Sequence, residues 1–339
     1  MHCLAHRLQL ALVQASKDVV PIFHFFGHLT SIINGVGASS KRNDELRAAK
    51  ASEILYLISI DELETGRGLN QIGNLQRPGD TRWSSHFRSV SSLIKMFSPA
   101  CEVLLHIMDD AATGIDRGLA DGAYNLLTSF DFVFILHLMK EIMGITDILC
   151  QALQSASQDI LNAIHLVSST KGLLQKLRDD GWVALLATIK AFCVARNLAI
   201  LDMSTRYIPN RSGRAHGRQD DQFTIEHHYR VDIFYAAIDS QLQELNSRFN
   251  EHSMELQTLS FSLDPREHES FKIDDICCLV NKFYPQDFTD QEKIELKMQL
   301  SHYQHDVLSD SNFKKLSTLN ELSQWLVRTR KSSISHLVH

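Results

Sequence analysis

Apolar residues recur at steps of three and four positions along most of this 339-residue chain, and that spacing is typical of amphipathic α-helices. After Ser84 the repeat predicts five successive helices, near residues 84–109, 118–131, 132–155, 158–180 and 182–203. A long amphipathic helix should follow the loop at 204–222. Three shorter helices are expected after Pro265, near residues 270–283, 290–306 and 312–329. Thr289 and Glu292 should cap the second of these as a capping box.

The first hundred residues follow the helical pattern less regularly. Residues 2–36 predict two helices that separate near Pro21, and a third helix is expected at about 44–60. The glycine-rich stretch 61–83 reads as extended chain, and residues 72–76 within it predict a short β-strand. The pattern as a whole therefore predicts a mainly α-helical chain with one small extended element.

Composition adds little to the fold but restricts the partners. The formal net charge of −6 gives no overall signal for nucleic acid or an anionic membrane. Residues 1–100, in contrast, carry 11 Lys and Arg against 8 Asp and Glu, a surplus of three positive charges. A nucleic-acid contact should therefore lie in the N-terminal third or in a local basic loop.

The cysteines and the most apolar stretches indicate a soluble, reduced, intracellular protein. None of the six cysteines forms a CxxC pair, which argues against a zinc ribbon. The apolar stretches 132–145 and 183–201 are interrupted by charged residues, so they predict core helices and not membrane spans. The first residues lack the pattern of a signal peptide.

Two short motifs near the N-terminus are candidate sites. Cys3 and His6 lie three residues apart on a predicted helix, but a metal site would need two further ligands, so helix packing is the favoured interpretation. In the sequence Thr81-Arg82-Trp83, the Trp is either a packing anchor or a platform for an unpaired base whose phosphate the Arg would hold. Packing is again the more common role.

The loop at 204–222 is an exposed basic loop and a candidate phosphate contact, or else simply a solvated loop. Its four arginines are Arg206, Arg211, Arg214 and Arg218. Adjacent carboxylates such as Asp109 and Asp110 point about 100° apart on a helix, so they do not form a two-metal clamp. The sequence also lacks a phosphate-binding loop, a GxSxG motif and an HExxH motif. It predicts no catalytic residue, no metal ligand and no cofactor.

Four motifs in a fixed order resemble the hAT superfamily of DNA transposases. They are residues 3–10 (Cys-Leu-Ala-His-Arg-Leu-Gln-Leu), 81–85 (Thr-Arg-Trp-Ser-Ser), 217–249 and 283–322. The closer likeness is to the plant zinc-finger MYM-type-like, TTF-domain proteins derived from these transposases. Together the motifs cover nearly the whole chain.

The resemblance implies a fragment of an RNase H-like α/β core followed by a large helical insertion domain. The expected divisions are 1–92 for the partial core, 93–280 for the insertion and 281–339 for the start of a C-terminal dimerisation region. An RNase H-like core without its first strands would leave the helices at 4–36 without a sheet to cover. We therefore expect that part to pack loosely and residues 90–280 to form the stable unit.

The resemblance also assigns roles to particular residues. Cys3, His6 and Thr81 match family-motif positions. Trp83, with Arg82, matches the position thought to stabilise a hairpin or flipped base by stacking. Family catalysis uses three carboxylates that hold two divalent metals, yet no acidic residue of this chain matches those positions. We therefore expect a chain truncated at both ends and without transposase activity.

The sequence leaves two main functional interpretations open. The first is a nuclear, transposable-element-derived protein that retains binding to hairpin or single-stranded DNA, or self-association as a homodimer, without a membrane or small-molecule partner. The second is a helical protein-interaction scaffold without a nucleic-acid role. If DNA binding survives, Arg82, Arg88, Lys95 and the arginines of 206–218 should share one face. A third interpretation, a metal-dependent nuclease, requires cleavage in Mg²⁺ or Mn²⁺, which we do not expect.

Overall fold

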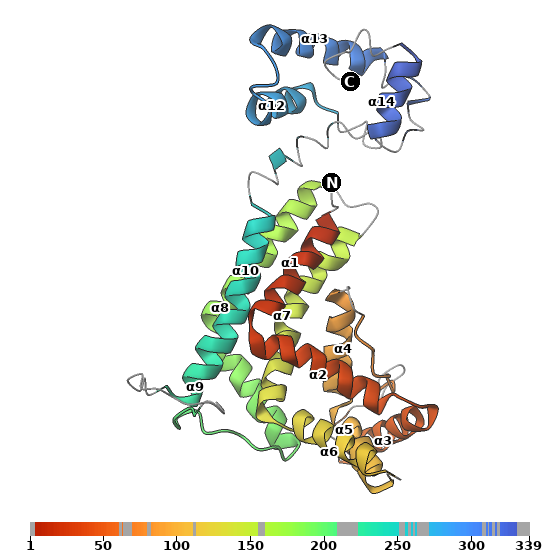
Figure 1. The fold of residues 1–339 in the computed structure, drawn as a ribbon, viewed down its shortest axis with the longest axis vertical. Helices are drawn as coiled ribbons and strands as arrows, with labels where there is room; N and C mark the ends of the chain where they lie inside the picture. Colours follow the sequence, from red (N-terminus) through yellow and green to blue (C-terminus); the bar gives the residue numbers. More distant parts are fainter. Residues whose placement is uncertain are drawn as a thin grey trace. The chain divides into compact units, whose positions relative to one another are not determined.

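The structure is a computed structural model, and it confirms the mainly α-helical class. It describes residues 4–60, 63, 70–79, 83–110, 113–154, 160–208, 223–250, 255–256, 259, 262, 271–306, 310, 312–313, 316 and 319–330. Within those residues the regular elements are all helices (Figure 1). The chain divides into two compact units: Met1–Gln158 with Leu166–Arg248, and Asp159–His165 with Phe249–His339.

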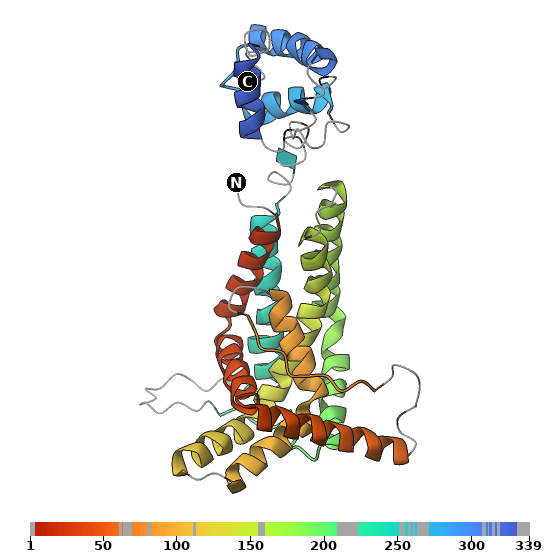
Figure 2. The ribbon, with the colours of Figure 1, turned by 90° about the vertical axis from the view of Figure 1, so that its right-hand side faces the viewer.

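Unit 1 contains most of the helices. They are α1 (Leu4–Asp18), α2 (Val20–Val36), α3 (Ser40–Ser59), α4 (Trp83–Lys95), α5 (Phe97–Asp110), α6 (Gly114–Leu127), α7 (Phe130–Gln154), most of α8 (Ile160–Ala195), α9 (Ile225–His227), the π-helix η1 (His228–Tyr235) and α10 (Ala236–Arg248). α1 packs along α10, α4 packs along α7, and α5 lies between α3 and α6 (Figures 1 and 2). This arrangement buries a continuous apolar core between the long helices.

A proline stands just after each of the two sharp corners that shape unit 1. α1 and α2 meet at 107°, and Pro21 stands in the first turn of α2, where its missing N–H costs no helical hydrogen bond. α4 and α5 meet at 76° at Met96, and Pro99 stands in the first turn of α5. No single helix in the described residues is long and apolar enough to cross a membrane, although each of these bent pairs reaches that length and apolarity together.

The described residues of unit 2 after Phe249 include three helices around a small core. α12 (Ile273–Phe283), α13 (Asp290–Asp306) and α14 (Leu319–Arg328) surround the buried side chains of Phe271, Ile276, Val280, Leu296, Leu300, Tyr303, Phe313, Leu322 and Leu326. The predicted capping box is confirmed at the start of α13. The carboxylate of Glu292 accepts the backbone N–H of Thr289 at 2.7 Å, and the Thr289 hydroxyl accepts the N–H of Glu292 at 3.2 Å.

Two predicted elements are corrected. The helices expected at 158–180 and 182–203 form one continuous helix, α8, which runs through Gly181. A single glycine inside a helix costs only about 1 kcal/mol, so the packing of a long helix outweighs it. A Cβ at Gly181 would lie 2.6 Å from Leu177 of the same helix, whereas its distance of 3.7 Å to Phe234 of η1 is ordinary van der Waals contact. The strand expected at 72–76 is irregular chain that runs beside α4 and pairs with no strand (Figure 2). The described residues therefore contain no part of the sheet that an RNase H-like core requires.

The N-terminal helices are packed and not loose, contrary to the prediction for residues 4–36. Leu8, Leu12 and Leu29 are fully buried. The amide of Gln241 on α10 donates to the backbone carbonyl of Leu12 at 3.3 Å. α1 therefore covers α10 and α7, so helices supply the apolar surface that the prediction assigned to a missing sheet. The two compact units also differ from the three predicted divisions, since residues 1–92 and α4–α10 share unit 1.

Burial of His137 on α7 predicts a loss of stability in acid. Its side chain is 4% exposed and its Nδ1 lies 2.9 Å from the Val133 carbonyl oxygen. Desolvation lowers the pKa of His137 from its usual 6.5, against the effect of that hydrogen bond. Below pH 6.5 His137 therefore binds a proton in the unfolded chain but stays neutral in the folded chain. The free energy of unfolding should then fall by up to about 1.4 kcal/mol for each pH unit.

Urea unfolding at pH 7.5 and pH 5.5 measures this effect. The His137→Leu variant should lose less stability between the two pH values than the wild-type protein. The variant of an exposed histidine on α5, His106→Leu, is the control and should behave as the wild type. Equal losses of stability in the wild type and in His137→Leu would show that His137 is protonated equally in the folded and unfolded chains.

Candidate nucleic-acid interface

Trp83 is a core residue and not an exposed base-stacking platform. It begins α4, is 1% exposed, and its indole N–H donates to the Thr146 hydroxyl of α7 at 2.8 Å. Its ring centroid lies 6.2 Å from that of Phe26 on α2. A ring buried to this extent cannot stack on a base unless the core opens, so the packing interpretation of Trp83 is correct for this structure.

Most of the other predicted site residues lie outside the described part of the chain. These are Cys3, Thr81, Arg82, Arg211, Arg214 and Arg218. His6 is exposed on α1. Within the described residues, no group of three or more His, Cys, Asp or Glu side chains could hold a metal ion.

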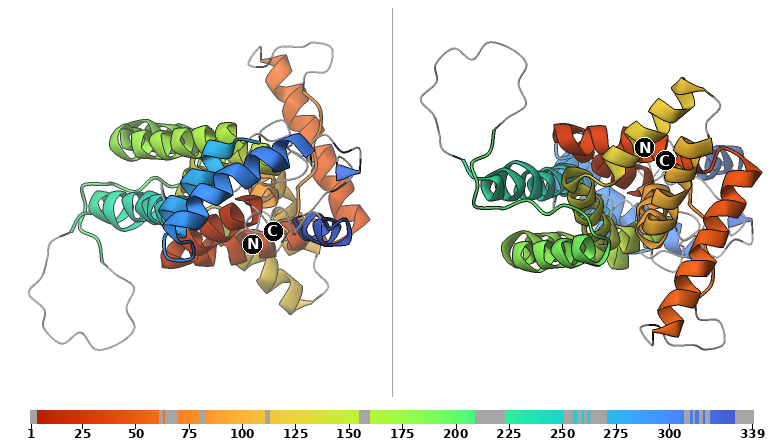
Figure 3. Two further views of the ribbon diagram at one scale, coloured as in Figure 1. Left: turned by 90° about the horizontal axis from the view of Figure 1, so that it is seen from above. Right: turned by 90° about the horizontal axis from the view of Figure 1, so that it is seen from below.

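Arg206 is exposed and lies where the chain enters the basic loop. It forms an isolated antiparallel bridge with Thr224, and the next residue, Tyr207, stacks on His228 with ring centroids 3.9 Å apart. These contacts place Arg206 beside α9. Figure 3 shows α9 and α3 on opposite sides of unit 1. Arg206 therefore does not share a face with α3, and the single basic face expected for Arg88, Lys95 and the arginines of 206–218 does not include Arg206.

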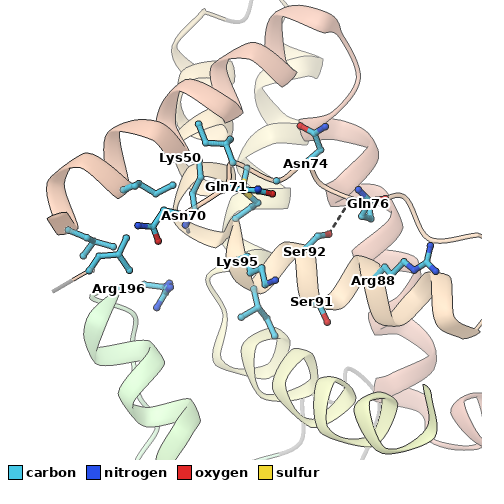
Figure 4. A pocket seen from close by; sticks show the side chains of 17 residues that line it. Lys50, Asn70, Gln71, Asn74, Gln76, Arg88, Ser91, Ser92, Lys95 and Arg196 are labelled. Carbon is cyan, nitrogen blue, oxygen red and sulfur yellow. Dashed lines mark hydrogen bonds between the residues drawn. The ribbon is translucent and has the colours of Figure 1, made fainter. Parts of the chain in front are cut away.

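Arg88 and Lys95, in contrast, line one cavity of about 820 Å³ (Figure 4). α4 supplies both residues, α3 supplies Lys50, and Arg196 stands just beyond the end of α8. Amide side chains of the irregular segment 70–76 complete the rim. We call this cavity, together with the smaller one that adjoins it, the basic groove.

The periodicity of α4 explains why its polar residues face the groove. Arg88, Ser91, Ser92 and Lys95 follow one another at helical steps of three and four, so they share one stripe of the helix. Buried side chains such as Leu93 pack on other sides. The sequence alone therefore contained a pattern that indicates a polar, basic face on α4.

Hydrogen bonds hold the segment 70–76 against the helices. The Ser92 hydroxyl accepts the backbone N–H of Gln76 at 3.0 Å, and the Arg47 guanidinium donates to the Asn74 side-chain oxygen at 2.8 Å. Asn70 adopts a left-handed conformation with φ of 58°, which Asn tolerates better than most residues. This irregular chain thus forms a polar wall and not a sheet edge.

An adjoining cavity of about 360 Å³ extends the groove along α4. It shares Gln76 and Arg88 with the larger cavity and adds Arg77, whose guanidinium also donates to the Gly37 carbonyl at 3.3 Å. Among the described residues, five cations line the two cavities and no carboxylate does: Lys50, Arg77, Arg88, Lys95 and Arg196.

The five cations differ in how far they are already neutralised. Lys50 contacts Glu53 at 2.7 Å, whereas Arg88 and Lys95 are exposed. The guanidinium of Arg196 lies 3.8 Å from the Phe192 ring centroid, and its Nε is buried without a hydrogen-bond partner. Partial burial lowers the pKa of Arg196, yet an arginine remains charged at neutral pH. The groove therefore concentrates positive charge, of which only Lys50 is paired with a carboxylate among the described residues.

No protein-family model matches the chain, and no solved structure is significantly similar to it. The chemistry of the groove has to be inferred from its own residues. Sequence reasoning singled out Arg88 and Lys95 but missed Lys50, Arg77 and Arg196, which come from three other segments.

Proposed function

We propose that the chain binds nucleic acid by holding phosphate groups in the basic groove. The observation that carries the proposal is the set of five lining cations without a lining carboxylate among the described residues. Two adjoining cavities along α4 suit a chain of phosphates better than a single anion. Arg and Lys contacts to successive phosphates supply most of the sequence-independent affinity for nucleic acid.

The groove's lining favours backbone binding over base recognition. Its apolar lining residues are aliphatic, such as Ile54, Ile72 and Ile94, and no described aromatic ring lines it. Base stacking, which needs aromatic platforms, is therefore not part of the proposal. We expect binding that depends strongly on salt and weakly on base sequence.

The resemblance to hAT transposases supports DNA as the nucleic acid. In this proposal the chain is a catalytically inactive, transposase-derived protein of the nucleus, and residues 1–92 descend from part of an RNase H-like core. The C-terminal residues 281–339 would correspond to the beginning of a dimerisation region, so the chain would bind DNA as a homodimer. Hairpin and single-stranded DNA are the expected ligands.

A salt titration of the purified chain tests the proposal. We expect a labelled single strand to bind with a slope of log affinity against log salt of about −3.5, because about five phosphates would each contribute roughly −0.7, and a hairpin to bind with a slope at least as steep. Strands of different base composition should bind alike, and DNA incubated with Mg²⁺ or Mn²⁺ should stay intact. Absence of binding at 50 mM salt would refute the proposal, and cleavage would instead favour a nuclease.

A helical protein-interaction scaffold is the second candidate, and exposed apolar residues near the end of α3 favour it. Leu55 and Tyr56 are 67% and 64% exposed, and Ile60 is 43% exposed. Scattered exposed apolar residues are common on protein surfaces, so this observation carries less weight than the groove. A scaffold would leave DNA unbound at low salt, which the same titration detects.

A further inference from the structure

A second cavity of unit 1 lies between α1, α2 and α4 and shares no lining residue with the basic groove. Its volume is about 440 Å³. Phe23 and Phe26 of α2 and Trp83 of α4 supply aromatic surface. Phe23 is 53% exposed, so its ring is accessible to a ligand in the cavity. We call this cavity the aromatic pocket.

The polar side chains at the aromatic pocket include one cation, three histidines and the hydroxyls of Ser16 and Thr30, which donate to backbone carbonyls of their own helices. Lys17 of α1 lines it together with His24 and His28, which are four residues apart on one face of α2. The rings of His24 and His28 stack with centroids 6.4 Å apart. No carboxylate lines the pocket among the described residues.

The carboxylate nearest in sequence to Lys17 is engaged elsewhere. Asp18 accepts hydrogen bonds from Gln14 at 3.1 Å and from Ser240 of α10 at 2.8 Å. Lys17 forms no ion pair with a described residue. Its ammonium is therefore a charge at the lining of an aromatic cavity, and no anion among the described residues pairs with it.

Gly27 keeps this pocket open. It lines the cavity in the middle of α2, and a Cβ added to it would meet no heavy atom within 4 Å. A glycine inside a helix costs about 1 kcal/mol relative to alanine. Close packing does not require a glycine at this position. Gly27 therefore makes α2 less stable than alanine would, and it leaves space in the aromatic pocket that a side chain could fill.

We propose that the aromatic pocket binds a small monocarboxylate with an apolar, preferably aromatic, body. The body would lie against Phe23 and Phe26, with the largely buried Trp83 closing the inner end, and the carboxylate would accept from Lys17 and the imidazole N–H groups of α2. A cavity of this size is within the range that small ligands fill. Aromatic rings pair favourably edge-to-face with such a body.

Isothermal titration calorimetry with the full chain tests this proposal through three carboxylates: 2-naphthoate, 1-naphthoate and octanoate. We expect at least one naphthoate to bind, and the neutral analogue 2-naphthamide to bind at least tenfold more weakly than 2-naphthoate. Lys17→Met should weaken naphthoate binding about tenfold. Gly27→Leu should abolish it by filling the cavity while favouring the helix.

Gly172→Leu is the matched control, because Gly172 is a helical glycine of α8 whose added Cβ also meets nothing within 4 Å. It should bind naphthoate as the wild type does, and both leucine variants should unfold at or above the wild-type temperature. The proposal is overturned if none of the three carboxylates binds, if the amide binds as tightly as the acid, or if Gly27→Leu binds like the control.

Discussion

Replacing Trp83 with alanine is expected to lower the free energy of unfolding of unit 1 by about 3–5 kcal/mol. The indole is 1% exposed, packs beside Phe26 and donates to Thr146, so the truncation leaves a large cavity and removes a buried hydrogen bond. Trp83→Phe keeps most of the ring and should cost only about 1–2 kcal/mol through the lost indole N–H. Urea unfolding followed by circular dichroism measures both differences.

Two controls separate packing from a role in binding. Tyr56→Ala removes an aromatic side chain that is 64% exposed, and it should change stability by less than about 0.5 kcal/mol. Trp83 does not line the basic groove, so Trp83→Phe should retain wild-type affinity for DNA. Unchanged stability of Trp83→Ala together with lost DNA binding would restore the base-stacking interpretation.

The sequence predicted the helices well wherever the apolar repeat was long and local signals agreed. The capping box of Thr289 and Glu292 and the break at Pro21 are such signals. It failed at Gly181, because a single glycine costs a helix only about 1 kcal/mol and α8 continues through it. It also failed at 72–76, where a strand-like composition found no partner strand in the described fold.

The candidate groove was only partly visible in the sequence. The polar stripe of α4 contains Arg88 and Lys95 at helical spacing, and it could have indicated an exposed basic face. Lys50 and Arg196 are separated by almost half the chain, and only the packing of α3, α4 and α8 brings them to one cavity. The sequence also left open whether Trp83 packs in the core or stacks on a base. Its hydrogen-bond partner, Thr146, lies on another helix 63 residues later, so only the folded structure brings the two together.

Reversing two charges of the groove is expected to weaken DNA binding about 30- to 100-fold at low salt. The Arg88→Glu/Lys95→Glu variant loses two phosphate contacts and places two carboxylates next to the phosphates. The resulting repulsion should reduce the binding free energy by about 2–3 kcal/mol, which corresponds to that loss of affinity. Both side chains are exposed, so the fold should tolerate the change. Loss of Lys95 from the last turn of α4 should cost at most about 1 kcal/mol.

The matched control is Lys140→Glu/Lys176→Glu, which changes the net charge equally at exposed positions of α7 and α8 outside the groove. Fluorescence anisotropy of a labelled hairpin at 50 mM salt, with the wild type and both double variants, tests the central claim most directly. The groove predicts a 30- to 100-fold loss for the first variant and a loss of less than about threefold for the control. Equal losses in the two variants, or none in either, would contradict it.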